Sequence, residues 1–281
     1  MLIRILSGIV GALTYSFLVF SWNGVAFAVG VAVFAMLAAS EFYRAVRRQG
    51  GEPTDFLGYV ACVVFQFAAY PLHGAKFATF LPASLMLLVI ATLLVELVKR
   101  RTKPIINIGA TLLGAIYVGW MFSYLTLLRE TNWPMIHAPL PRTTSGEWLL
   151  IFVTATTWLS DAGALFAGRA FGRHKMAPLI SPAKTWEGSI GGLLLSMLGG
   201  FGLTLWFHMP VPFGIGLGLL CGLAGQTGDL CESALKRDLG VKDFGDVIPG
   251  HGGILDRIDS LLFSAPLAYY YILILGPLLK H

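Results

Sequence analysis

Three acidic side chains in the C-terminal part of the chain have a spacing that suits phosphate chemistry. Asp229, Ser233 and Lys236 follow one another at intervals of four and three residues, so on a continuous helix they lie on one face. Asp256 and Asp259 place two more carboxylates one helical turn apart. Carboxylate oxygens bind Mg²⁺, and neighbouring cations neutralise phosphate oxygens. The pattern therefore predicts a site for phosphoryl or nucleotidyl transfer.

A further acidic residue, Asp161, lies inside a long apolar stretch, a few residues before Gly168. A carboxylate at membrane depth costs several kcal/mol, so such residues usually face a polar cavity and mark function. The alternative is a structural acid that pairs with an arginine. We interpret Asp161 as part of the same site.

The basic segment after Gly168 offers cations for a phosphate group. Lys184 follows Ser181 and Pro182, a pair typical of a turn, and we interpret it as a phosphate contact. Arg173 and Lys175 lie in the same segment. They fit a phosphate site and the contacts of a membrane surface with anionic lipid equally well.

A glycine-rich segment joins the two acidic clusters. Its glycines are Gly240, Gly245, Gly250, Gly252 and Gly253. Such a backbone can approach an anion closely and offer its N–H groups, although an ordinary turn has a similar composition. His251, in the same segment, could be a general base, a metal ligand or a polar loop residue.

The elements that carry these residues belong in a membrane. Of the 281 residues, 56% are apolar and 12% are charged, whereas soluble domains carry about 25% charged residues. The apolar runs are continuous rather than alternating, which favours helices over a barrel. The 20 Lys and Arg residues form short clusters and no continuous stripe, which argues against nucleic-acid binding.

We predict an all-α polytopic integral membrane bundle of about nine transmembrane helices. A hydrocarbon core of ~30 Å needs roughly 20 apolar residues per span. The candidate spans are residues 2–20, 23–40, 56–72, 77–98, 105–128, 148–168, 189–208, 211–230 and 259–277. Five spans form an N-terminal region, 1–147, and four form a catalytic region, 148–281. We expect the two regions to fold as one structural unit.

The basic residues predict the orientation of this bundle. They gather after the second, fourth, sixth and eighth spans. The positive-inside rule then places the N-terminus in the cytoplasm and the C-terminus outside. Glu41 and Glu96 lie near the ends of predicted helices, and we interpret them as partners of these basic clusters.

The run from Ser233 to Asp259 resembles the signature of phosphatidate cytidylyltransferases, also called CDP-diacylglycerol synthases. It reads S-A-L-K-R-x4-K-D-x-G-x2-I-P-x-H-G-G-I-x-D-R-I-D, with no departure from that signature. Segments 159–164 and 181–188 are similar to other landmarks of the family. Specific similarity therefore covers roughly residues 158 to 260, and before residue 147 it is confined to the acid beside aromatic residues at Glu41 to Tyr43.

The resemblance implies an enzyme of the bacterial inner membrane, facing the cytoplasm, that joins CTP and phosphatidate and releases pyrophosphate. It implies Mg²⁺, leaves a second cation open, and implies a homodimer. Asp229 and Asp256 would be the principal metal ligands, with Asp259 as a third. The catalytic set would be completed by Asp161, Lys184, Lys236 and Arg237, and the substrates would contact Ser233, Lys242, Asp243, His251, Gly252, Gly253 and Arg257.

Two other functions compete with this interpretation. In a CTP-dependent lipid kinase, a lipid hydroxyl would attack the γ-phosphorus and release CDP instead of pyrophosphate. A membrane transporter would place its charged residues near the bilayer midplane and usually contains an inverted repeat, whereas the sequence has no visible repeat and its acidic residues gather near the ends of predicted spans.

Overall fold

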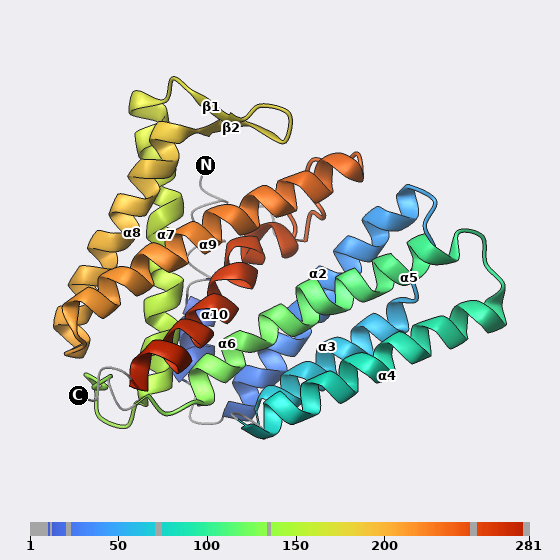
Figure 1. Ribbon diagram of the computed structural model, residues 1–281, viewed down its shortest axis with the longest axis horizontal. Helices are drawn as coiled ribbons and strands as arrows, with labels where there is room; N and C mark the ends of the chain where they lie inside the picture. Colours follow the sequence, from blue (N-terminus) through green and yellow to red (C-terminus); the bar gives the residue numbers. More distant parts are fainter. Residues whose placement is uncertain are drawn as a thin grey trace. The chain divides into compact units, whose positions relative to one another are not determined.

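Figure 1 shows the computed structural model of the protein, which describes residues 11, 13–20, 24–70, 75–133, 136–247 and 252–277. In chain order the elements are α2 (Gly24–Arg48), α3 (Asp55–Ala69), α4 (Ala75–Lys99), α5 (Pro104–Leu113), the π-helix η1 (Gly114–Trp120), α6 (Met121–Glu130), α7 (Ser145–Phe171), β1 (Lys175–Ala177), β2 (Ser181–Thr185), α8 (Trp186–Phe207), α9 (Val211–Asp238) and α10 (Leu255–Leu275). The all-α prediction is confirmed, with the addition of one short hairpin.

Within the described residues, seven helices are long and apolar enough to cross a membrane. They are α2, α4, the continuous segment Pro104–Glu130 formed by α5, η1 and α6, and α7 to α10. The chain is therefore an integral membrane protein. Of the nine predicted spans, seven are confirmed, the third corresponds to the shorter apolar helix α3, and most of the first lies outside the described residues.

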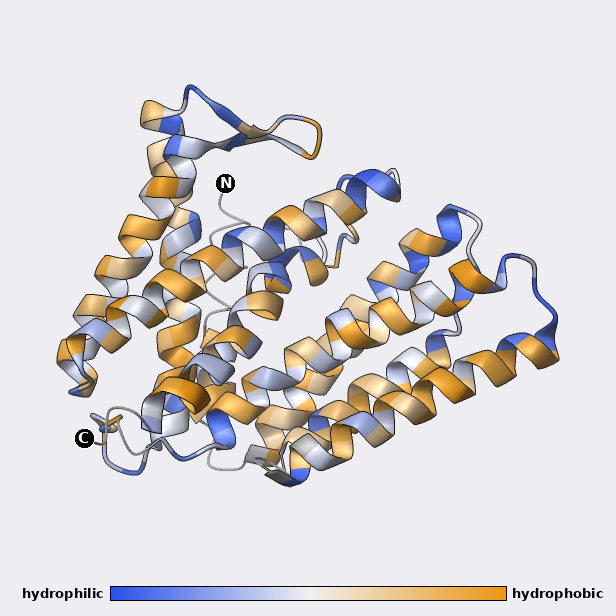
Figure 2. Cartoon of the chain, viewed as in Figure 1, coloured by the Kyte–Doolittle hydropathy of each residue, from blue (hydrophilic) through white to orange (hydrophobic). Residues whose placement is uncertain are grey.

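The surfaces of these helices suit a lipid environment. On α8, the exposed residues Ile190, Leu194, Leu198 and Leu205 recur every three to four residues or a multiple of that interval, so they form one apolar face. Figure 2 shows the same hydrophobic character along α4, where the share of buried residues is the lowest among the seven candidate spans. Apolar faces without a protein partner are expected where the solvent is hydrocarbon.

The chain divides into two compact units. The first contains Met1–Glu130 and Asp238–Ile258, and the second contains Thr131–Arg237 and Asp259–His281. Helix α10 begins in the first unit and continues in the second.

Tyr43 lies at the centre of the first unit, where α2, α3 and the α5–η1 segment meet. Its hydroxyl donates a hydrogen bond to the Thr111 carbonyl at 2.9 Å. The ring contacts positions Gly58 and Gly114, where a Cβ atom would collide with it. The wider π-helix turns start at Gly114, three residues after the carbonyl that Tyr43 engages. These two glycines therefore let three helices approach one buried aromatic ring.

Charged residues of the first unit form a network beside the ends of α3, α4 and α5. The Arg101 guanidinium lies 3.1 Å from Glu96 Oε1 and donates to the Glu52 carbonyl at 2.8 Å. The Asn107 side chain donates to Glu96 Oε2 and accepts the Glu52 N–H. The predicted pairing of Glu96 with a basic cluster is thus confirmed.

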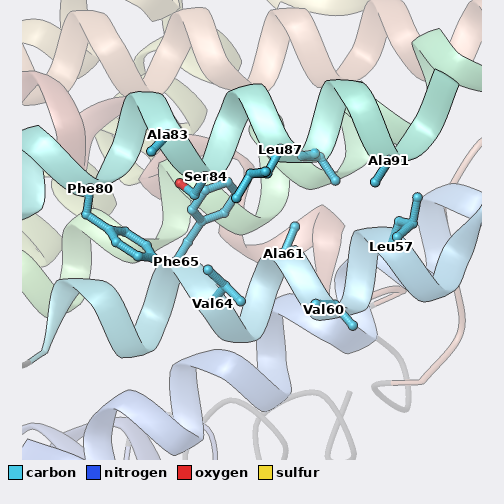
Figure 3. A pocket seen from close by; sticks show the side chains of 11 residues that line it. Leu57, Val60, Ala61, Val64, Phe65, Phe80, Ala83, Ser84, Leu87 and Ala91 are labelled. Carbon is cyan, nitrogen blue, oxygen red and sulfur yellow. The ribbon is translucent and has the colours of Figure 1, made fainter. Parts of the chain in front are cut away.

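An apolar groove lies between α3 and α4 of the first unit (Figure 3). Leu57, Val60 and Val64 line it from α3, and Phe80 and Leu87 line it from α4. All of its lining residues are apolar except one serine. The groove therefore belongs to the lipid-facing part of the unit and offers no group for phosphate chemistry.

In the second unit, helices α7, α8 and α9 pack through small residues. A Cβ atom at Gly192 would lie 2.6 Å from the Ser160 carbonyl of α7, and one at Gly218 would lie 2.7 Å from the Ser196 carbonyl of α8. The Ser196 hydroxyl contacts two carbonyls, Thr156 O on α7 and Gly218 O on α9. Close backbone approach through glycine and serine is typical of helices packed in membranes.

A two-stranded hairpin connects α7 to α8, and the sequence did not predict it. Strand β1 pairs antiparallel with β2, with Lys175 opposite Thr185 and Ala177 opposite Ser181. The interpretation of Ser181 and Pro182 as a turn is therefore wrong, because the turn occupies residues 178–180. Pro182 is tolerated in β2 because a strand at the edge of a sheet can leave one backbone position without a hydrogen-bond donor.

Candidate active site

Three carboxylates of the second unit converge between the C-terminal third of α9 and the second turn of α10. Asp229, Glu232 and Asp259 each offer one oxygen atom, and these atoms lie within 4.8 Å of one another. Glu232 is 1% exposed and Asp259 is 8% exposed. Among the described residues this is the group of acidic, cysteine or histidine side chains close enough to share a metal ion. Three hard oxygen donors in a buried setting suit a divalent cation such as Mg²⁺.

The approach of α9 to α10 depends on a glycine directly before Asp229. A Cβ atom at Gly228 would lie 2.6 Å from the Asp259 carbonyl and 3.0 Å from the ring of Phe263. One turn earlier, a Cβ atom at Gly225 would lie 3.0 Å from Thr157 Cγ2 and 3.5 Å from Ser260 Cβ. These contacts bring the Asp229 and Asp259 backbones close enough for their side chains to meet.

Two lysines pair with the acidic group. Lys184 Nζ lies 2.8 Å from Asp229 Oδ2, and Lys236 Nζ lies 2.5 Å from Glu232 Oε2, four residues earlier on α9. Asp161 on α7 is exposed, and its charge is among those that act on the Asp259 carboxyl group. Three carboxylates therefore lie beside two ammonium groups, and this excess of negative charge favours a divalent cation.

The hairpin delivers Lys184 to this group. Thr185, the next residue, caps α8 by accepting the Gly188 N–H on its hydroxyl oxygen. Glu187 accepts the backbone N–H groups of Arg173 and His174, and its Oε1 lies 2.5 Å from His174 Nδ1. The base of the hairpin is thus fixed to the first turn of α8, which restricts the position of Lys184.

Two other predicted residues of the second unit lie beside the acidic group or the hairpin. The Ser233 hydroxyl donates to Asp229 Oδ1 at 3.5 Å, as expected for residues four apart on one helix face. Arg237 Nε donates to the Ile180 carbonyl at 3.0 Å. Arg237 therefore holds the turn of the hairpin in this structure.

The remaining predicted residues belong to the first unit. Asp256 Oδ2 accepts the backbone N–H groups of Phe244 at 3.0 Å and Gly253 at 2.9 Å. Gly252 has a positive φ of 84°, a conformation that glycine adopts without a steric penalty. The side chains of Lys242, Asp243 and Arg257 are exposed, and His251 lies outside the described residues.

Four N–H groups in the described part of the glycine-rich segment and at the start of α10 have side-chain acceptors. Besides the two donated to Asp256, those of Ile254 and Leu255 are donated to the carboxylate of Glu41 on α2. These four N–H groups are therefore donated to carboxylates of the chain itself, and binding of a phosphate anion by the segment stays a prediction. We expected Glu41 to pair with a basic cluster, but its carboxylate accepts these two backbone N–H groups instead.

Sequence reasoning missed two acidic residues at these positions. Glu232 lies one helical turn after Asp229 and four residues before Lys236, and this spacing was the available signal. Glu41 is more than two hundred residues from its hydrogen-bond donors, so no local pattern could connect them. An acidic residue between apolar and aromatic neighbours was the available signal for Glu41.

The fold and this site define a polytopic membrane protein whose acidic and basic side chains gather at the ends of its last helices. The model of the cytidylyltransferase family matches residues 2–275, so the chain belongs to that family of nucleotidyltransferase enzymes. The family resemblance noted in the sequence is thereby confirmed.

Several bacterial relatives share this similarity. A protein of Synechocystis sp. named phosphatidate cytidylyltransferase is 34% identical, over 99% of this chain and 98% of its own length. One of the same name from Bacillus subtilis is 31% identical, over 95% of this chain and 96% of its own length. A third of that name, from Staphylococcus aureus, is 41% identical over 53% of this chain and 52% of its own length. The first two similarities extend over both units.

Proposed function

We propose that this protein is a phosphatidate cytidylyltransferase, which converts CTP and phosphatidate to CDP-diacylglycerol and pyrophosphate. The observation that carries the proposal is the full-length similarity to two relatives of that name. The converging carboxylates and lysines of the second unit support it, because they suit two substrates that both carry phosphate. The alternatives of a lipid kinase and a transporter have no comparable support.

The reaction needs two anions to approach each other. A phosphatidate oxygen attacks the α-phosphorus of CTP, a new P–O bond forms, and the bond from the α-phosphorus to its leaving oxygen breaks as pyrophosphate departs. The attacking oxygen already carries negative charge, so no side chain has to remove a proton. The demand on the protein is to hold both phosphate groups and to neutralise their charge.

We assign the charge-neutralising role to the lysines and the acidic group. Lys184 and Lys236 exchange their carboxylate partners for phosphate oxygens when the substrates bind. Asp229, Glu232 and Asp259 would hold Mg²⁺, which when bound would neutralise the developing charge on the phosphate oxygens. We retain Asp256 as a proposed metal ligand, as the sequence predicts. Asp161 and Ser233 adjust the charge and hydrogen bonding around these ligands.

The segment at the start of α10 is assigned to substrate binding. Its exposed cations, Lys242 and Arg257, contact the phosphates of CTP or of the lipid. Asp243, Gly252 and Gly253 shape the same segment, and His251 belongs to it by sequence. Arg237 reaches the triphosphate by leaving the Ile180 carbonyl.

The proposed setting is the bacterial cytoplasmic membrane. The basic clusters that follow alternate spans support a site at the cytoplasmic face, where CTP is available. Phosphatidate enters sideways from the inner leaflet with its acyl chains still in lipid. We also propose a homodimer, which the family resemblance implies and chemical crosslinking in native membranes can test.

The decisive experiment compares nucleotides and products. Purified protein is incubated with phosphatidate, Mg²⁺ and each of the four nucleoside triphosphates in turn, and pyrophosphate and liponucleotide are measured. The proposal predicts both products with CTP. Release of CDP with a phosphorylated lipid would instead establish a kinase, and the absence of any CTP-dependent product would refute the assignment.

A further inference from the structure

A buried carboxylate of α2 holds the first turn of α10. Glu41 is 0% exposed. Its Oε1 accepts the Ile254 N–H at 3.0 Å, and its Oε2 accepts the Leu255 N–H at 2.9 Å. The first N–H groups of a helix have no partner within the helix, and the helix dipole favours a negative charge at that end. Glu41 thus completes the hydrogen bonding of α10 from a helix far away in sequence.

The next residue of α10, Asp256, is held by the same segment. Its Oδ2 accepts the N–H groups of Phe244 and Gly253. A Cβ atom at Gly253 would lie 2.5 Å from Glu41 Oε2 and 2.9 Å from Asp256 Oδ2. Gly253 therefore fits between the two carboxylates, and its lack of a side chain lets both of them reach consecutive backbone donors.

Further contacts attach the segment before α10 to α2. The rings of Phe42 and Phe244 lie 6.0 Å apart, and Gln49 Nε2 donates to the Leu239 carbonyl at 2.9 Å. A Cβ atom at Gly245 would collide with Glu41 Oε1. Helix α2 and Gln49, the residue that follows it, thus hold the segment at three points, and Glu41 makes the contact next to Asp256.

We propose that Glu41 is a positioning residue for cytidylyl transfer. By fixing the Ile254 and Leu255 backbone it sets the direction in which Asp256 leaves α10. The inference rests on the proposed function, since Asp256 matters to catalysis only if that site binds the substrates and the metal. It differs from a role in stability alone, because a loosened segment changes metal dependence even in protein that stays folded.

The test compares two buried acids of the same unit. Glu41→Gln keeps the size of the side chain, removes one acceptor and points an amide N–H₂ group at a backbone donor. Glu96→Gln is the matched control, because Glu96 is 7% exposed and its partners are Arg101 and Asn107. Both variants lose a buried carboxylate, so both report the general cost of that loss.

Hydrogen–deuterium exchange and Mg²⁺ titration are then measured on the full chain in lipid nanodiscs. Glu41→Gln is expected to speed exchange of the amides at 254 and 255 by about tenfold or more, since a lost hydrogen bond lowers local protection. It is also expected to raise the Mg²⁺ concentration for half-maximal activity by ~10–100-fold, as loss of a residue that orients a metal ligand typically does. Glu96→Gln leaves both quantities unchanged.

Wild-type exchange at 254 and 255 in folded Glu41→Gln, with an unchanged Mg²⁺ titration, would overturn the inference. If Glu41→Gln does not fold, Gly245→Ala provides the second test, because its methyl group displaces the Glu41 carboxylate without removing it. The same two shifts are expected there, and their absence counts against the inference. An inactive wild-type protein would refute the proposed function instead, and the exchange comparison would still decide whether Glu41 holds α10.

Discussion

Lys184 Nζ lies 2.8 Å from Asp229 Oδ2, so a cation carried by the β-hairpin meets an acid carried by α9. The lysine is 23% exposed at its side chain and the aspartate is 37% exposed. An ion pair with this much exposure contributes little to stability. We propose that the pair matters because it places a phosphate-binding cation beside the acidic group.

Replacing that lysine is expected to impair catalysis more than folding. Lys184→Met should lower kcat/KM for CTP by roughly 100-fold, the scale of losing one charge-stabilising group in a transition state. Lys175→Met, on the exposed strand β1 of the same hairpin, should leave kcat/KM within about twofold, because a solvated surface cation contributes little. Steady-state kinetics with varied CTP gives both values, and equal effects of the two variants would contradict the role given to Lys184.

Removing Glu232 tests the composition of the acidic group. Glu232→Gln should weaken Mg²⁺ binding by about 10–100-fold, because one of three carboxylates within 4.8 Å is lost. Asp238→Asn, at the exposed end of the same helix, serves as the control. Isothermal titration of Mg²⁺ into the EDTA-treated protein measures the affinity directly. A Glu232→Gln affinity like that of the wild-type protein would remove Glu232 from the ligand set.

Widening the contact between α9 and α10 should separate the carboxylates. Gly228→Ala places a methyl group 2.6 Å from the Asp259 carbonyl, and overpacking of this kind costs ~1–3 kcal/mol. Gly202→Ala on α8 is the matched control, because a Cβ atom there meets no heavy atom of the described chain within 4 Å. It should be neutral or stabilising by about 0.5–1 kcal/mol.

Thermal unfolding and activity distinguish these glycine variants. A lowered Tm together with lost activity in Gly228→Ala supports the packing of α9 on α10 described above. Unaltered activity and Tm in that variant would show that the two helices can relax apart without disturbing the site.

Two threonine caps separate the stability of a helix from the placement of Lys184. Thr144 caps α7 in a capping box with Glu147, and Thr185 caps α8 next to Lys184. Thr144→Ala and Thr185→Ala should each cost ~0.5–2 kcal/mol of stability. Only Thr185→Ala should also raise KM for CTP, because it loosens the base of the hairpin. Chemical denaturation and kinetics measured side by side check this, and an equal KM in both variants would contradict it.

Helical periodicity accounts for what the sequence predicted well. The apolar runs located the long helices, and the four-residue spacing of Asp229 and Ser233 predicted that their side chains meet, which the structure confirms. Glu232 and Lys236 are also four residues apart and form an ion pair. The prediction considered only the helix face that carries Asp229, so it did not include Glu232. The grouping of carboxylates was thus predictable in kind, although one of its members was overlooked.

Other features depended on contacts that leave no local pattern. The hairpin between α7 and α8 is short, and its strands alternate too briefly to be recognised. The position of the hairpin depends on Glu187 and Thr185, which attach its base to the first turn of α8. The role of Glu41 depends on a tertiary contact, so a reading of neighbouring residues assigned it to the nearest cations.

The Glu41 contact also orders events during biogenesis. Its two backbone donors lie 213 and 214 residues downstream, where the last helix of the structure begins. During synthesis α2 is made long before α10, and burying a carboxylate without hydrogen-bond donors is costly. The Glu41 carboxylate therefore lacks these two hydrogen-bond donors until the start of α10 has been made. The contact can form only near the end of synthesis, when the last helix joins the helices made before it.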